Sequence, residues 1–174
     1  GVVSGGARGV DSVAHRICLD EGLPTLCVLP SGVLNAYPRE HQDLWDRIVA
    51  EGGCVLSTFS SRIEMRKHHF HTRNRWIVGL AKSVFVPEAN RRSGSALTAG
   101  LALQEGRELA ALPVFPHSEH GMGNLDLLYN GAALIRDHRD LNVFWANSRL
   151  CPTLLEGLHG EGEEDHGDQP KTDI

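Results

Sequence analysis

Apolar residues in this chain occur either in short continuous runs or at helical spacing. The continuous run at Thr25–Leu29 predicts a buried strand of a parallel sheet covered on both faces, and Cys54–Ser57 predicts another strand. Helical spacing at Val10, Val13, Ala14, Ile17 and Cys18 predicts a helix with one apolar face. The alternation continues through most of the chain and predicts an extended, Rossmann-like, doubly wound and mostly parallel α/β sheet.

The chain enters this pattern in an unusual place. Its first residues, Gly1 to Ser4, have the character of a strand end and lead directly into a glycine-rich turn. A Rossmann-type sheet normally has a strand, a loop and a helix before such an element. We therefore expect a sheet that lacks its first strand.

Charge divides the chain into two regions. The formal net charge is −5, but residues 151–174 hold seven acidic residues and one lysine, a net −6, which leaves +1 for residues 1–150. The segment 151–174 is rich in glycine and acids and lacks apolar periodicity, so we expect a disordered acidic tail. Residues 1–150 form the predicted domain, and their charge does not argue against a nucleic-acid partner.

Composition excludes several classes of protein. No apolar run reaches the length of a membrane span, and no signal peptide is visible. The four cysteines form no C-x-x-C pair and fit reduced residues of a cytoplasmic protein. We find no nucleophile elbow, no Walker loop and no paired carboxylates, and we expect neither an enzyme nor a bound cofactor.

The first candidate site is the loop Ser4–Gly9, which we call the glycine loop. It joins a predicted strand to a predicted helix, where backbone N–H groups and the helix dipole attract anions. Gly5 and Gly9 allow the sharp turn, and the planar guanidinium of Arg8 matches phosphate. A tight turn without any ligand is the alternative.

A second loop of the same kind follows a later strand. It carries four candidate anion-binding residues, Arg92, Ser93, Gly94 and Ser95. A serine at this position can cap the next helix or hold a phosphate. Because both loops follow strand ends of one parallel sheet, we expect them to face the same crevice.

The third candidate is the basic stretch 62–75, in which cationic side chains surround one aromatic residue. Its candidate nucleic-acid contacts are Lys67, Phe70, Arg73, Asn74 and Arg75. Cations for the backbone and a ring for a base are the combination that single-stranded DNA requires, although Phe70 would also fit a core. The neighbouring histidines lack cysteine or carboxylate partners at ligand spacing, so we predict no metal site.

The order of these motifs resembles the DNA-processing protein A family (DprA, or Smf) over about residues 1–140. The first matching motif begins Val3-Ser4-Gly5-Gly6-Ala7-Arg8-Gly9-Val10-Asp11 and continues with Ala14-His15. Further matches are Tyr37-Pro38-Arg39-Glu40-His41, Arg73-Asn74-Arg75 after Phe70, Glu88-Ala89, Arg92-Ser93-Gly94-Ser95, Thr98-Ala99, Gly106-Arg107-Glu108 and Gly131-Ala132-Ala133-Leu134-Ile135. The chain departs from the family at Gly6, His69 and His71, and we expect it to lack the family's N-terminal helical domain and C-terminal winged helix.

The resemblance implies an extended Rossmann fold that binds single-stranded DNA. Such proteins act in natural transformation, protect incoming strands, load a RecA-type recombinase and form homodimers. The positions that match the family's DNA contacts are Gly5, Arg8, Gly9, Lys67, Phe70 and Arg73 to Arg75, with Ser93 to Ser95 as a weaker phosphate pocket. The alternative is a nucleotide-binding sensor or a nucleoside-monophosphate phosphoribohydrolase, although the stretch Arg92 to Ala99 lacks the glutamate of that enzyme's motif.

Overall fold

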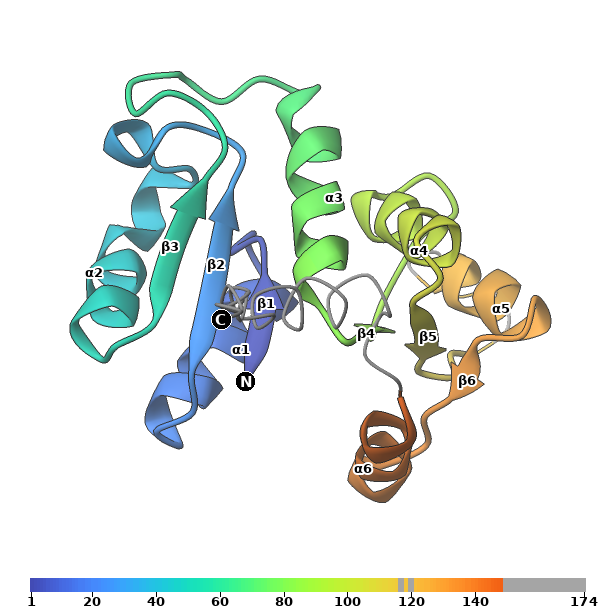
Figure 1. Cartoon of the computed structure of the whole chain (residues 1–174). Helices are drawn as coiled ribbons and strands as arrows, with labels where there is room; N and C mark the ends of the chain where they lie inside the picture. Colours follow the sequence, from blue (N-terminus) through green and yellow to red (C-terminus); the bar gives the residue numbers. More distant parts are fainter. Residues whose placement is uncertain (116–117, 119–120, 149–174) are drawn as a thin grey trace, which may run out of the picture.

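Strands and helices alternate along the chain in the computed structural model, which describes residues 1–115, 118 and 121–148 (Figure 1). The strands are β1 (Val2–Ser4), β2 (Thr25–Leu29), β3 (Cys54–Ser57), β4 (Ser83–Val86), β5 (Glu108–Ala111) and β6 (Ala133–Leu134). The helices are α1 (Val10–Asp20), α2 (Gln42–Ala50), α3 (His69–Leu80), α4 (Gly94–Gln104), α5 (Met122–Tyr129) and α6 (His138–Asn147), with 3₁₀ turns η1 (Val33–Asn35) and η2 (Arg39–His41). The predicted α/β class is confirmed, whereas the predicted tail, 151–174, lies outside the described residues.

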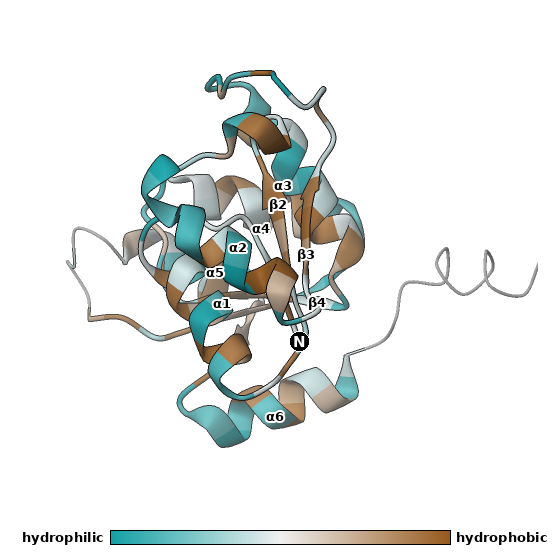
Figure 2. Ribbon diagram, turned by 90° about the vertical axis from the view of Figure 1, so that its left-hand side faces the viewer, coloured by the Kyte–Doolittle hydropathy of each residue, from teal (hydrophilic) through white to brown (hydrophobic). Residues whose placement is uncertain are grey.

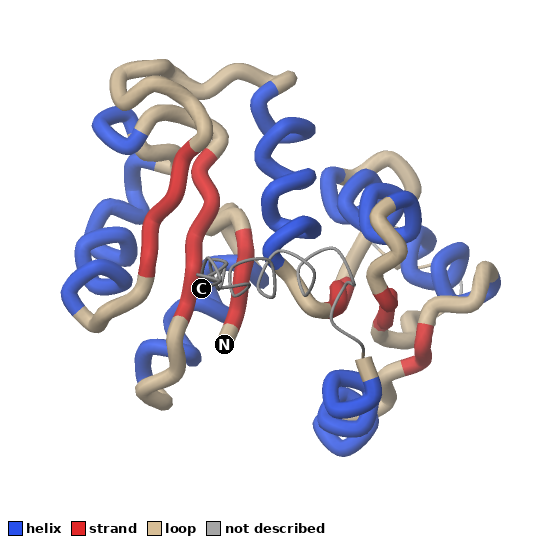
Figure 3. The backbone as a smooth tube through the Cα atoms, viewed as in Figure 1, coloured by secondary structure: helices blue, strands red, loops and turns tan. Residues whose placement is uncertain are grey.

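All strand pairs are parallel, as expected, but they form two sheets. One sheet has the order β1-β2-β3 and the other β4-β5-β6. Each of β1 and β4 has one edge that pairs with no strand among the described residues, so the two sheets are not joined by strand pairing. Helix α3 connects the two halves, since it contacts β1 and β2 and packs along α4 (Figure 3). The expected loss of a first strand concerns residues before Gly1 and stays a prediction.

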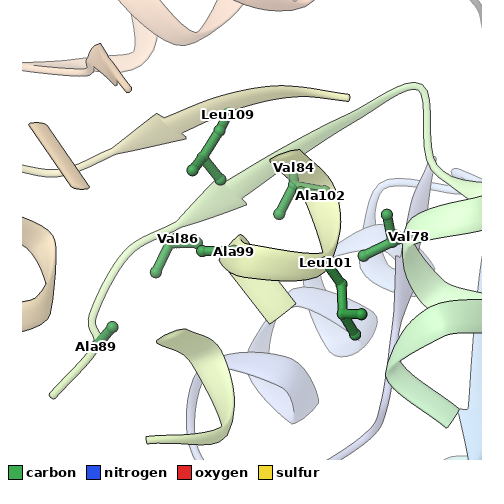
Figure 4. Packing of buried hydrophobic residues seen from close by; sticks show 8 residues of the cluster. All are labelled: Val78, Val84, Val86, Ala89, Ala99, Leu101, Ala102 and Leu109. Carbon is green, nitrogen blue, oxygen red and sulfur yellow. The ribbon is translucent and has the colours of Figure 1, made fainter. Parts of the chain in front are cut away.

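Each sheet has its own hydrophobic core. The first core joins β2 to α1 and α2 and consists of Leu19, Cys27, Leu29, Ala36, Leu44, Trp45 and Ile48. The second joins β4 and β5 to α3 and α4 and consists of Val78, Val84, Val86, Ala89, Ala99, Leu101, Ala102 and Leu109 (Figure 4). Strands β2 and β3 are coloured as hydrophobic along most of their length in Figure 2. Strand β2 is buried over most of its residues, as predicted, whereas the edge strand β3 is half-buried with Cys54 exposed.

Helix α1 buries only part of its predicted apolar face. Cys18 is buried, at 5% exposure, whereas Val10, Val13 and Ile17 each keep about half of their surface accessible, at 48%, 53% and 55%. The helix also buries His15 and Leu19, at 0% and 5% exposure. The helix forms where the spacing predicts it, but its buried side is displaced towards His15 and Leu19.

A polar contact lies on this buried side. His15 lies 2.6 Å from the hydroxyl of Thr25 through its Nδ1, and that hydroxyl donates to the carbonyl of Val2 at 3.2 Å. Because Thr25 uses its proton on Val2, Nδ1 of His15 must be the donor to Thr25. Burial lowers the pKa of His15 from 6.5 to about 4, which keeps the ring uncharged.

Among the described residues, every helix is too short or too polar to cross a bilayer. Three cysteines can be placed, Cys18, Cys27 and Cys54, and all three are free thiols. Burial raises the pKa of Cys27 to about 12, so its thiol stays protonated and unreactive at neutral pH.

Candidate nucleic-acid interface

The glycine loop runs from the end of β1 to the start of α1, as predicted. Gly6 and Gly9 adopt φ values of +61° and +86°, which residues with a side chain rarely adopt. A Cβ on Gly6 would also overlap the ring of Trp45. The loop therefore has a shape that glycine alone permits at these positions.

Side chains from two elements hold this loop in place. One oxygen of Asp11, Oδ2, accepts hydrogen bonds from the N–H groups of Gly5 and Ala7, at 3.2 and 3.1 Å. His41 approaches the carbonyl of Gly6 at 3.0 Å through Nδ1, which must be the donor because the partner is a carbonyl. The loop is thus fixed before any ligand arrives.

A buried cation lies beneath the loop. Arg73 is only 5% exposed, and its guanidinium occupies the space that a Cβ on Gly5 would need. Its Nη1 donates to the carbonyl of Val28 at 3.3 Å, whereas its Nε has no partner among the described residues. Burial lowers the pKa of Arg73, and the nearby carboxylate of Asp11 partly opposes that shift.

An alternating set of cations and rings runs along the rim of the loop. The Arg8 guanidinium lies 5.9 Å from the ring centroid of Tyr37, whose ring meets Phe70 edge to face at 6.3 Å. Phe70 in turn lies 5.3 Å from the Arg73 guanidinium. We call these four residues the cation–ring row. Both rings are half-buried, so each presents part of its surface to solvent.

Arg8 is the exposed cation of the row, and it already has an acidic partner. It forms an ion pair with Glu40, which lies in the 3₁₀ turn η2 just before α2. Both side chains keep half or more of their surface accessible. The neighbouring Tyr37 and the carboxylate of Glu40 raise the pKa of Arg8. A phosphate that binds Arg8 must therefore compete with the Glu40 carboxylate.

The residues predicted from 62–75 lie in different places. Lys67 is exposed just before α3, and Phe70 lies in the row. Asn74 is buried, at 7% exposure, beside Arg73 on the inner face of α3. Arg75 points elsewhere, because it lies 3.7 Å from Glu105 on α4. The structure thus brings Phe70 and Arg73 to the glycine loop but not Arg75.

The loop that precedes α3, residues 58–68, is fixed by its backbone; we call it the basic loop. Gly32 and Leu34 donate backbone hydrogen bonds to it, each at 2.8 Å, and the Asn35 side chain donates to the carbonyl of Arg62 at 2.5 Å. A Cβ on Gly32 would overlap the carbonyls of Ser60 and Ser61. A cavity of about 330 Å³ opens beside this loop, lined by Arg62, Ile63, Glu64, Met65, Arg66 and His69.

The histidines of this region have structural contacts. His69 is buried, stacks on Phe59 at 4.2 Å between ring centroids, and lies 3.1 Å from the carbonyl of Pro30 through Nδ1. In the part of the chain that the structure describes, no three His, Cys, Asp or Glu residues gather as metal ligands.

The second loop forms the start of α4, as predicted. Ser93 caps the helix: its hydroxyl accepts from the N–H of Ala96 at 3.2 Å and donates to the carbonyl of Asn90 at 2.7 Å. Arg92, Gly94 and Ser95 are exposed. No hydrogen bond or ion pair within the described ranges links this loop to the glycine loop, so the expected common crevice stays a prediction.

Three residues of the interface escaped the sequence-based selection. Asp11, Tyr37 and Glu40 all stand inside quoted motifs, yet none was chosen as a site residue. Tyr37 and Glu40 reach the site only through the fold, from a loop about 30 residues after Arg8. Asp11 had a local signal, since an acid in the first turn of a helix is placed to accept from nearby backbone N–H groups.

Comparison with known proteins gives a consistent result. The family described as "DNA recombination-mediator protein A" matches residues 1–146. Protein Smf of Escherichia coli K12 is 37% identical over 140 residues, which cover 80% of this chain and 37% of that protein. The DNA processing protein DprA of Streptococcus pneumoniae R6 is 36% identical over 140 residues, covering 80% and 49%.

Two solved structures agree with the fold. The X-ray structure of DNA processing protein A from S. pneumoniae matches with a TM-score of 0.74 at 34% identity, covering 81% of this chain and 50% of that one. A structure of DNA processing protein A from Helicobacter pylori, described for its unique single-stranded DNA binding mode, matches with a TM-score of 0.70 at 30% identity, covering 89% and 66%. The chain thus spans about half or less of the length of the curated relatives cited above.

Proposed function

Because this chain belongs to the DNA recombination-mediator protein A family, we propose that it binds single-stranded DNA along the cation–ring row. The row carries the proposal, since it sets an exposed guanidinium and two half-buried rings beside a rigid glycine loop. Guanidinium groups neutralise phosphates, and aromatic rings stack on bases of any sequence. The binding mode for which the H. pylori relative is described supports the same ligand.

Each candidate residue has a distinct part in this proposal. Arg8 and Lys67 are exposed and contact phosphates, and Phe70 stacks on a base. Gly5 and Gly9 give the loop its shape. Arg73 acts from beneath Gly5 as a buried charge, with Asn74 beside it, whereas Arg75 could meet only a strand that continues towards α4.

The second loop extends the proposed site. Arg92, Gly94 and Ser95 are exposed at the start of α4, where helix N–H groups favour a phosphate. Ser93 contributes by shaping the loop, because its hydroxyl caps the helix and its N–H donates to the carbonyl of Asn90 at 3.0 Å. This loop is the weaker of the two phosphate contacts.

The wider role follows from the family. We propose that the protein works in the cytoplasm as a homodimer in DNA processing and natural transformation, where it protects incoming strands and assists a RecA-type recombinase without catalysis. The alternative of a nucleoside-monophosphate phosphoribohydrolase predicts release of free base from nucleoside monophosphates. Rapid release in that assay would replace the proposal.

Fluorescence anisotropy with labelled oligo-dT, over a range of salt concentrations, tests the binding. We expect Arg8→Ala to weaken affinity about tenfold at low salt and to reduce the slope of log K against log salt by about one. Arg139→Ala on α6 removes the same charge from an exposed position and should change neither value. Equal affinity of Arg8→Ala and the parent at every salt concentration would refute the row as the binding site.

A further inference from the structure

The glycine loop contains the backbone groups of an anion site. In loops of this kind, N–H groups converge at the start of a helix and hold the phosphate of a nucleotide. Here the N–H groups of Gly5 and Ala7 also converge, but on Oδ2 of Asp11, which stands in the first turn of α1. A carboxylate of the chain itself thus occupies the position that a ligand's phosphate would take.

The rest of the loop keeps this carboxylate in place. Gly5 and Gly6 are buried, with Arg73 against one and Trp45 against the other, so the loop has little room to open. The buried Arg73 guanidinium also favours a negative charge nearby, as the upward effect of Asp11 on its pKa indicates. Expelling the carboxylate would leave two N–H groups without acceptors and a buried cation without compensation, and both changes are unfavourable.

We propose that Asp11 is an internal anion that closes the backbone phosphate site of the glycine loop and so determines the specificity of the interface. Free phosphate and mononucleotides then find no pair of N–H groups to bind in the glycine loop. A polymer is held instead by side chains of the rim, through Arg8 and the two rings. The selection of strands over mononucleotides rests on the proposed function, whereas closure of the loop can be tested without DNA.

The test uses inorganic phosphate and thymidine 5′-monophosphate as probes, at ionic strength matched with sodium chloride. The parent should show at most the small phosphate-specific rise in melting temperature that the weaker second loop supplies. Asp11→Ala frees both N–H groups and should gain binding, with a rise of about 3–6 °C at ten times the dissociation constant. Asp11→Asn is the matched control, because its amide oxygen still accepts from both N–H groups while the charge is lost.

A competition experiment connects the loop to the strand. Both probes should displace labelled oligo-dT from Asp11→Ala, but not from the parent or Asp11→Asn beyond the effect of ionic strength. Failure of the parent to bind oligo-dT would remove the proposed function and leave the melting experiment intact. Phosphate stabilisation of the parent that equals that of Asp11→Ala would overturn the closure.

Folding of the variants does not decide the outcome alone. If Asp11→Ala does not fold, Asp11→Ser offers a shorter side chain that can accept from one N–H group at most, and it should gain phosphate binding. A folded Asp11→Ala or Asp11→Ser variant that shows no phosphate-specific rise in melting temperature would contradict the inference. If both variants unfold while Asp11→Asn folds, the loop requires a hydrogen-bond acceptor at position 11, which supports the filled site. The response of the parent to phosphate then decides whether the site is closed.

Discussion

The guanidinium of Arg73 lies against Gly5, on the side where any other residue would carry its Cβ. These residues are 68 positions apart, one before α1 and the other on α3. Their contact joins the glycine loop to the helix that presents Phe70. The shape of the loop and the position of the ring therefore depend on each other.

This contact makes position 5 sensitive to a single methyl group. Gly5→Ala forces the buried guanidinium or the loop to move, and overpacking of this kind costs about 1–3 kcal/mol. Urea unfolding should show that loss, and oligo-dT affinity should fall with it. Gly100→Ala is the control, because position 100 is exposed on α4 and the new Cβ meets nothing within 4 Å. This substitution should stabilise the protein by up to about 1 kcal/mol. Equal stability of the two variants would contradict the contact.

Removing the acidic partner of Arg8 should strengthen DNA binding. Glu40→Gln frees the guanidinium from its ion pair, and we expect oligo-dT affinity to rise about two- to fivefold at low salt, less at high salt. Glu51→Gln removes a similar exposed pair on α2, with Arg47, and should leave affinity unchanged. Weaker binding by Glu40→Gln would mean that Glu40 orients Arg8 rather than competing for it.

Phe70 should contribute affinity that does not depend on salt. Loss of one stacked base costs about 1–3 kcal/mol, so Phe70→Leu should weaken oligo-dT binding about 5- to 150-fold without changing the salt slope. Tyr129→Leu alters a ring that is 92% exposed on α5 and should have no effect. A changed slope in Phe70→Leu would point to displaced cations instead of lost stacking.

Buried His15 predicts how stability depends on pH. Its pKa falls from 6.5 when unfolded to about 4 when folded, so the unfolded chain binds more protons between these values. Stability should therefore be complete above about pH 7 and decline as pH falls towards 4. Between pH 7 and 5 the parent should lose about 2 kcal/mol more than His15→Gln, measured by urea unfolding. Parallel pH profiles of the two proteins would contradict a neutral buried imidazole.

Local features were predictable from the sequence where one segment determines them. The strands at Thr25–Leu29 and Cys54–Ser57 match the apolar runs, and both glycine-containing loops join a strand to a helix as expected. The divergence of Arg73 and Arg75 also has a local cause, because residues two apart on a helix point to different sides.

Features that depend on distant partners were not predictable. The buried side of α1 carries the hydrogen bond from His15 to Thr25, and the apolar periodicity of Val10, Val13 and Ile17 contains no sign of this contact. The ion pair of Arg8 with Glu40 requires the loop before α2 to fold back on the glycine loop. The division into two sheets depends on strand pairing, which periodicity within single strands does not contain.

The backbone bonds between the basic loop and the turn at Gly32 to Asn35 have a consequence for variation between related proteins. The loop has the composition of a segment that tolerates inserted residues, yet its carbonyls are matched to donors at fixed positions. Its length should consequently vary little among relatives that keep this turn, while the exposed side chains between its anchored carbonyls are free to change. Natural selection can adjust the charge of this rim through substitutions without an insertion or a deletion.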